Sequence, residues 1–143
     1  MLLGTYQGAI SLKRRVAIPA SFRKALGPKF IIAKWYEGCL ILTSLTSFEA
    51  LLTRLRPLTK PITQGIRDTD RFILGSAYEL TSDEQGRVVI PKSLASYAGI
   101  GKEVSFIGLG DRVEVWDRKS WEKKEEMVAR TAASSLEKLA HDK

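Results

Sequence analysis

The sequence predicts an α+β fold in which two tandem repeats build one β-barrel with flanking helices. Three observations predict this fold. A segment near the N-terminus recurs 72 residues later. Each copy alternates short β-branched runs with segments bounded by proline and glycine. Neither copy has enough strands to bury both faces of a sheet alone, so we expect the copies to pair in one pseudo-two-fold protomer.

The repeat is clearest around a β-branched strand. Residues 15–21 read RVAIPAS, and residues 87–93 read RVVIPKS. Across positions 15–27, six residues are identical to those 72 positions later, and both stretches end at a glycine, Gly27 or Gly99. Recurrence at a fixed offset indicates a duplicated structural unit.

Both copies follow the same order of local elements. A strand enters a polar turn, a β-branched strand follows, and a proline ends it and begins a short helix. A hairpin comes next, turning near Gly38 or Gly110, and an amphipathic helix closes each unit. The strand, β-branched strand and short helix are expected at 5–10, 16–18 and 20–26 in the first copy, and at 77–81, 88–90 and 92–98 in the second.

The closing helices carry two more expectations. In the first copy, Thr46 to Glu49 fits a capping box, which would start the helix there. Phe48, Leu51, Leu52 and Leu55 would form its apolar stripe. In the second copy the stripe would pack into the core, with an oligomer contact as the alternative; it comprises Trp121, Val128, Ala132, Leu136 and Leu139.

These elements divide the chain into three expected parts. Residues 1–56 would form the first repeat. Residues 57–75 would form a connecting segment, in which prolines at 57 and 61 break the chain and a short helix spans about 62–74. Residues 76–143 would form the second repeat with its C-terminal helix.

The positive charge is concentrated in the N-terminal part of the chain. The net charge is +7. Residues 1–60 hold ten Lys and Arg against two acids, whereas residues 61–143 hold thirteen against fourteen. This asymmetry indicates a polyanionic partner for the first part, with a merely solvated basic surface as the alternative.

Other classes of protein find little support. Cys39 and His141 are the only residues of their types, so an intrachain disulfide and a zinc finger are excluded. No phosphate-binding or dinucleotide fingerprint is present. We therefore expect no enzyme, no cofactor, no metal and no small-molecule substrate. The apolar runs are too short to cross a bilayer and no secretory signal is seen, so we expect a cytoplasmic protein.

The turns before the β-branched strands are the candidate functional site. Loop one (residues 11–15) reads SLKRR, and loop two (residues 83–87) reads DEQGR. In loop two, the carboxylate of Asp83 can accept backbone N–H groups and pair with Arg87, which would fix the turn. The pattern becomes specific because it is repeated and is followed each time by a Val-x-Ile-Pro run.

With these motifs in order along nearly the whole chain, the sequence resembles the MraZ family, a two-repeat branch of the AbrB-like superfamily with a swapped-hairpin, or double-split, β-barrel. Further matching stretches are Gly4, 72–79 and 113–117. The resemblance implies a transcription regulator in the nucleoid that represses the promoter of the division and cell-wall gene cluster, including its own gene. It also implies a ring-shaped, octamer-like homo-oligomer whose N-terminal loops face double-stranded DNA with short direct repeats.

Loop one departs from the family pattern. The family would have Asp at Ser11 and Gly at Arg14, so the departures leave three consecutive cations. We therefore expect loop one to contact DNA and loop two to be structural, through Asp83 and Arg87. The expected DNA contacts are Lys13, Arg14 and Arg15, with Arg23, Lys24 and Lys29 as secondary phosphate contacts.

Two other functions remain open from the sequence. An antitoxin-like interaction protein uses the same half-barrel, but it usually carries one copy and a disordered partner-binding tail. RNA binding is the other alternative, although no aromatic residue interrupts residues 12–20, where bases could stack.

Overall fold

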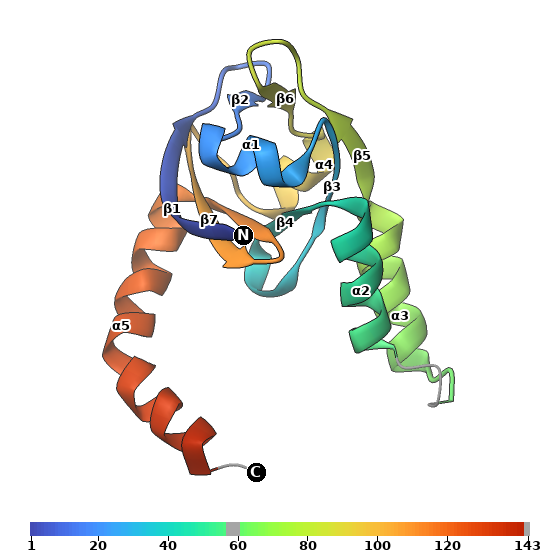
Figure 1. The fold of residues 1–143 in the computed structure, drawn as a ribbon, viewed down its shortest axis with the longest axis vertical. Coiled ribbons are helices and arrows are strands. Elements are labelled where there is room, and N and C mark those ends of the chain that lie inside the picture. The colour runs from blue at the N-terminus through green and yellow to red at the C-terminus, as the bar shows by residue number, and fades with distance from the viewer. Residues whose placement is uncertain (57–60, 142–143) are drawn as a thin grey trace.

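The computed structural model describes residues 1–56 and 61–141, and it has the α+β architecture that the sequence predicts (Figure 1). The strands are β1 (Leu2–Ala9), β2 (Arg15–Ala17), β3 (Lys29–Lys34), β4 (Leu40–Thr43), β5 (Tyr78–Thr81), β6 (Arg87–Val89), β7 (Glu103–Gly110) and β8 (Val113–Asp117). The helices are α1 (Ala20–Leu26), α2 (Leu45–Leu55), α3 (Gln64–Ile73), α4 (Lys92–Tyr97) and α5 (Arg118–His141), with short 3-10 turns η1 (Tyr36–Gly38) and η2 (Leu74–Ser76).

Strands from the two halves of the chain pair with one another. A six-stranded sheet has the order β1-β7-β8-β4-β3-β5, and β2 pairs with β6 in a separate two-stranded ribbon. All these pairings are antiparallel. The β5–β3 pairing repeats the β1–β7 pairing, because Thr81 pairs with Lys29 as Ala9 pairs with Glu103; β5 lies 72 residues after β1, and β7 lies 74 residues after β3. Within the described residues, β1 and β5 are the edges of the sheet, so hydrogen bonds do not close the predicted barrel.

The apolar residues form two clusters. The larger cluster lies between the ribbon, α1, α4 and the sheet, and its fully buried side chains include Ile18, Phe22, Ile90 and Leu94. Each such side chain contributes about 1.5–3 kcal/mol when buried. These residues are related in pairs by the offset, and they fix the two loops that precede β2 and β6. The second cluster holds α2 and α3 against the sheet.

One glycine is required by the close approach of β1 to β7. A Cβ atom at Gly108 would lie 2.7 Å from the backbone carbon of Leu2 and 2.7 Å from the backbone nitrogen of Leu3. Backbone atoms cannot give way as a flexible side chain can. The pairing of the N-terminal strand with the second half therefore depends on the missing side chain at position 108.

The expected capping box of α2 is wrong. The helix begins two residues earlier, at Leu45, and its N-cap is Ser44, whose Oγ accepts the backbone N–H of Ser47 at 3.2 Å. Ser44 follows β4 directly in an extended conformation, which suits an N-cap. The apolar stripe is as predicted: Phe48, Leu51 and Leu52 are buried, and Leu55 packs against them.

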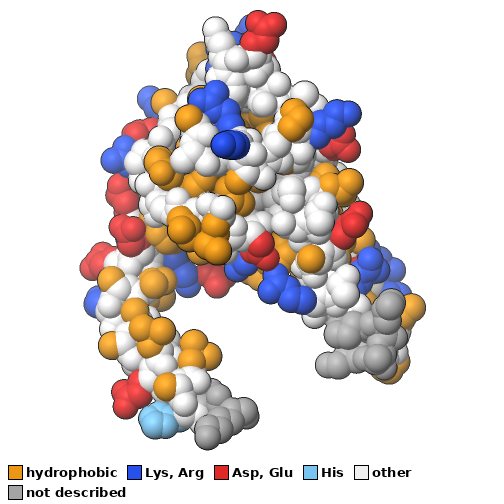
Figure 2. Space-filling model, viewed as in Figure 1, with side chains coloured by type: hydrophobic (Ala, Val, Ile, Leu, Met, Phe, Trp, Pro, Cys, Tyr) orange, Lys and Arg blue, Asp and Glu red, His pale blue; other side chains and the backbone are white. Residues whose placement is uncertain are grey.

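The expected core packing of the C-terminal stripe is also wrong. Only Trp121, at the start of α5, packs against the core, beside Trp116. The rest of α5 runs away from the sheet (Figure 1), and no residue in it is buried. Val128, Leu136 and Leu139 are 44%, 67% and 69% exposed. Figure 2 shows hydrophobic side chains along this helix. Within the described residues of one chain, the part of the stripe beyond Trp121 is therefore left largely uncovered.

The connecting segment is described in part. Its helix, α3, spans Gln64–Ile73 and is capped by Thr63, close to the expected bounds. Residues 57–60, where we expected a chain break, lie outside the described residues. Among the helices of the described residues, none combines the length and the hydropathy of a membrane-spanning segment.

Candidate nucleic-acid interface

Loops one and two lie together at one end of the molecule, opposite the direction in which α5 runs (Figure 1). The β2–β6 ribbon joins their C-terminal sides. Two equivalent backbone bonds cross between them: Ile18 donates to the carbonyl of Gly86 at 2.9 Å, and Ile90 donates to that of Arg14 at 2.8 Å. Loop two is therefore held by the residue that follows β2, and loop one is held by the residue that follows β6.

Loop two is fixed by a carboxylate. The Oδ1 atom of Asp83 accepts the backbone N–H groups of Gln85 and Arg87, both at 2.9 Å. The Nε of Arg87 donates to Oδ2 at 3.0 Å, so the expected ion pair is present. The backbone N–H of Arg87, followed by that of Gln85, holds the pKa of Asp83 below its usual value. This carboxylate therefore stays ionised at neutral pH and neutralises the arginine of its own loop.

Loop one adopts the same turn with different side chains. The Oγ of Ser11 accepts the backbone N–H of Arg15 at 3.1 Å, which is the role that Asp83 has in loop two. Arg14 has a φ of 59° where Gly86 has 73°. A side chain in this left-handed region costs about 1–2 kcal/mol. The two halves thus keep one backbone geometry despite the sequence departures.

Arg14 has a structural contact that the sequence did not predict. It is half-buried, and its Nε donates to the carbonyl of Ile90 at 3.0 Å. This bond anchors loop one to the end of β6 and helps to offset the backbone strain. Arg14, one of the expected DNA contacts, is therefore anchored within the protein by its own side chain.

Lys13 and Arg15 are the exposed cations of loop one. Among the described residues, neither has an acidic partner within ion-pair distance. The side chain of Ser11 is a neutral hydroxyl, so loop one has no carboxylate at this position to pair with the guanidinium of Arg15. The backbone of Arg15 is nevertheless well fixed, because it is the first residue of β2. Loop one therefore presents two free positive charges on a rigid turn.

The secondary cations are dispersed. The Nη1 of Arg23, on α1, lies 3.4 Å from the carbonyl oxygen of Gln85, and its side chain covers Gly86. Lys24 is exposed on the same helix. Lys29 lies 3.9 Å from Glu79 across the β3–β5 pair, so its charge is partly balanced. The structure thus brings Arg23 to loop two, not loop one.

A groove of about 560 Å³ lies beside loop one, between that loop and α4. Its charged side chains are Arg14, Lys92 and Lys102, and no acidic side chain lines it. Sequence reasoning missed Lys92 and Lys102, because both belong to the near-neutral second half of the chain. Only the pairing of the two halves brings them beside loop one.

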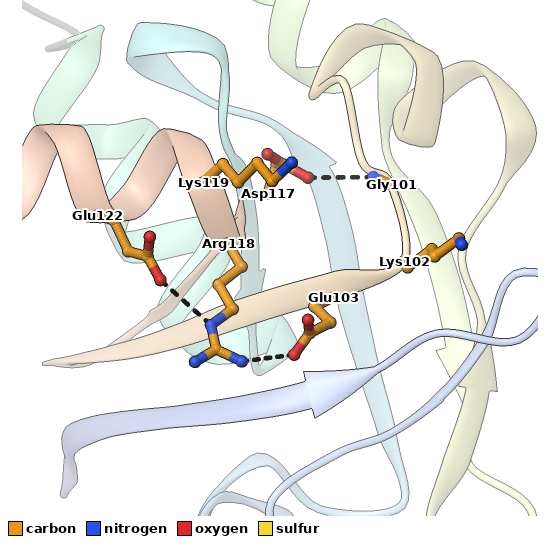
Figure 3. A pocket seen from close by; sticks show the side chains of 7 residues that line it. All are labelled: Gly101, Lys102, Glu103, Asp117, Arg118, Lys119 and Glu122. Atoms are coloured by element: carbon orange, nitrogen blue, oxygen red, sulfur yellow. Dashed lines mark hydrogen bonds and ion pairs between the residues drawn. The ribbon is translucent and has the colours of Figure 1, made fainter.

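A second hollow, of about 670 Å³, lies where β7 and α5 begin (Figure 3). Here Arg118 lies between Glu103 and Glu122 and donates to both. Glu103 raises the pKa of Arg118. Three cations and three acids line this hollow: Lys102, Arg118, Lys119, Glu103, Asp117 and Glu122. This balance of charge does not favour a polyanion, unlike the groove beside loop one.

Cys39 and His141 are the single cysteine and the single histidine of the chain. Cys39 is buried beside β4, and its burial raises the pKa of the thiol, so the sulfur stays protonated at neutral pH. His141 is exposed at the end of α5. In residues 1–56 and 61–141, no group of three His, Cys, Asp or Glu residues could hold a metal ion.

The known proteins that this chain resembles carry one family name. A family profile described as "MraZ protein, putative antitoxin-like" matches residues 73–142. The transcriptional regulator MraZ of Acetivibrio thermocellus is 42% identical over 141 residues, which cover 98% of this chain and 97% of that protein. The protein of the same name from Thermoanaerobacter sp. strain X514 is 43% identical over 124 residues, covering 85% of each chain. That from Pelotomaculum thermopropionicum is 40% identical over 141 residues, covering 98% and 93%.

Proposed function

The chain belongs to the MraZ family of transcriptional regulators, and we propose that it acts by binding double-stranded DNA sequence-specifically through loop one. The observation that carries the proposal is the pair of exposed cations, Lys13 and Arg15, on a turn fixed by backbone bonds. Cations on a fixed turn, with no acidic partner at ion-pair distance in the described part of the chain, suit a phosphate backbone and the acceptor edges of bases.

The two cations have different roles in this proposal. Arg15 opens β2, and its fixed backbone suits a bidentate contact to a guanine edge. Lys13 lies at the turn and suits a looser contact to phosphate. Arg14, Arg23 and Lys24 would add secondary phosphate contacts, while Asp83 and Arg87 would hold the shape of loop two.

The target and the assembly are the finer parts of the proposal. Resemblance to the family supports a repressor at the promoter of the division and cell-wall gene cluster, including its own gene, in the cytoplasm at the nucleoid. A ring of copies would present several copies of loop one to short direct repeats, so that weak sites act together. The exposed apolar stripe of α5 supports contacts between copies.

The fold suggests how one protomer is divided. We infer that residues 1–56 and 76–143 are the two repeats, joined by residues 57–75, and that each contributes half of a double-split arrangement with exchanged hairpins. The crossed pairings of β1 with β7 and of β5 with β3 support this division.

A salt titration of two variants tests the function. DNA selected by the protein from a random duplex pool serves as cognate DNA, and a scrambled duplex of equal composition is its control. Lys13→Ala should weaken binding to both duplexes alike and reduce the slope of log affinity against log salt by about 0.9. Arg15→Ala should weaken cognate binding more than scrambled binding, by about 1–3 kcal/mol.

Three outcomes would count against the proposal. If no duplex is enriched, the chain does not bind DNA sequence-specifically. Preferential binding to single-stranded RNA of the same sequence would favour the RNA-binding alternative. Equal losses on both duplexes for Arg15→Ala would leave Arg15 as an electrostatic anchor only.

A further inference from the structure

Leu12 is a large apolar side chain that no other described residue covers. It lies in the turn of loop one, between Ser11 and Lys13, and is 103% exposed. The position 72 residues later is Glu84, a charged residue of the kind expected at a solvated turn. A protein gains nothing in its folded state from a leucine held wholly in water, because its hydration cost remains.

The turn holds Leu12 in a defined place. On one side, the backbone N–H of Ser11 donates to the carbonyl of Arg15 at 3.0 Å; on the other, that of Arg14 donates to the carbonyl of Ser11 at 2.9 Å. The Nε of Arg14 ties the loop to Ile90. A side chain presented by a fixed turn loses little conformational freedom on binding, which suits recognition.

The surroundings of Leu12 identify what can cover it. Leu12 forms part of the rim of the groove whose charged side chains are Arg14, Lys92 and Lys102, and Lys13 follows it in the chain. A polyanion is therefore the partner that the local charge favours. In double-stranded DNA, the apolar group exposed in the major groove is the 5-methyl group of thymine.

We propose that Leu12 is a specificity-determining residue that packs against thymine methyl groups in the major groove, while the cations beside it bind the flanking phosphates. The inference rests on the proposed function and deepens it, because it adds an apolar contact to the guanine contact of Arg15. It gives the protein a preference for thymine at one or two positions of its site.

Replacing thymine by uracil tests this contact directly, because it removes only the methyl group. Duplexes selected by the wild-type protein are resynthesised with uracil, first at every thymine and then at one position at a time. Each methyl group in contact with Leu12 should account for about a fourfold loss of affinity on replacement. This arm uses the unaltered protein, so it does not depend on a variant that folds.

Three variants assign the effect to Leu12. Leu12→Ala should bind thymine and uracil duplexes equally, whereas Leu12→Met should retain the preference because its side chain still reaches the methyl group. Glu84→Ala, at the equivalent position of loop two, is the matched control and should keep the wild-type preference. Since Leu12 is fully exposed, the melting temperature of Leu12→Ala should equal that of the wild type.

The outcomes separate this inference from the proposed function. If no duplex is enriched, the proposed function fails and the inference fails with it. If duplexes are enriched but uracil changes nothing at any position, only the inference fails. It also fails if Leu12→Ala keeps the thymine preference, or if it lowers the mass of the protein in light scattering, since Leu12 would then be covered by another copy.

Discussion

The hydroxyl of Ser11 lies 3.1 Å from the backbone nitrogen of Arg15 and accepts its hydrogen bond. In loop two, the carboxylate of Asp83 accepts the same bond from Arg87 and also pairs with its guanidinium. A hydroxyl can satisfy the backbone but carries no charge for the side chain. The turn is thus conserved between the halves, while only loop one leaves its arginine without an acidic partner in the described residues.

A carboxylate at position 11 should weaken the binding of loop one to DNA. In Ser11→Asp, the new carboxylate should pair with Arg15 as Asp83 pairs with Arg87, so the preference for cognate DNA should fall by about 1–3 kcal/mol. Ser11→Asn supplies an oxygen acceptor without charge and should keep most of the preference. Fluorescence anisotropy with cognate and scrambled duplexes measures both. Equal behaviour of the two variants would show that the missing charge at position 11 is irrelevant.

The arginines of the two loops should differ in what they support. Arg15→Ala should weaken DNA binding and leave the melting temperature unchanged, because the Arg15 side chain is exposed. Arg87→Ala removes the partner of Asp83 and should lower the melting temperature by a few degrees, with little effect on DNA affinity. Calorimetry and DNA titration on both variants decide the matter. The reverse assignment of effects would contradict the roles proposed for the two loops.

Acid should release the hold of Asp83 on loop two. The pKa of Asp83 is lower in the folded protein than its ordinary value, which is about 3.9 in an unfolded chain. Its stabilising contribution is therefore fully present above about pH 4 and is lost as the pH falls through the lower, folded value. Asp83→Asn should lose less stability than the wild type on acidification below about pH 4. Glu84→Gln removes the same charge from the same loop but leaves the hydrogen bonds of Asp83 in place, so it serves as the matched control in acid unfolding followed by circular dichroism.

The backbone strain at Arg14 should be measurable. Arg14→Ala loses the bond to Ile90 and keeps the φ of 59°, whereas Arg14→Gly loses the bond and relieves the strain. The glycine variant should be more stable than the alanine variant by about 1 kcal/mol in urea unfolding. At neighbouring Lys13, which lacks a positive φ, the same pair of substitutions should not favour glycine. A more stable Arg14→Ala would mean that the turn relaxes.

The exposed stripe of α5 should mediate self-association. Light scattering should give a mass several times 15.9 kDa at micromolar concentration. Leu136→Glu and Leu139→Glu place charges in the stripe and should lower that mass, because both side chains are largely exposed in a single chain. Lys138→Glu, a charge change in the same turn of the helix but outside the stripe, is the matched control and should leave the mass unchanged. A clean monomer of the wild-type protein would overturn the assembly.

The sequence alone determined the duplication and most of the elements built on it. Proline and glycine bounded α1 and α4 because they act locally, through fixed φ, a missing donor or a permitted left-handed conformation. The ion pair of Asp83 and Arg87 could also be predicted from the sequence, because a tight turn brings together two side chains four positions apart. The start of α2 was misjudged, because two serines and a threonine within four residues compete for the N-cap.

Only the tertiary structure decided which side chains from distant parts of the chain lie together. The groove beside loop one combines Arg14 with Lys92 and Lys102, which only the pairing of the two halves brings together. The contact from Arg14 to Ile90 spans 76 residues and depends on the β2–β6 ribbon. The sequence also could not show whether the α5 stripe packs into the core, because periodicity marks an apolar face but not what covers it. Local chemistry can be derived from the chain itself, whereas long-range juxtaposition depends on how separate segments bury their apolar surface.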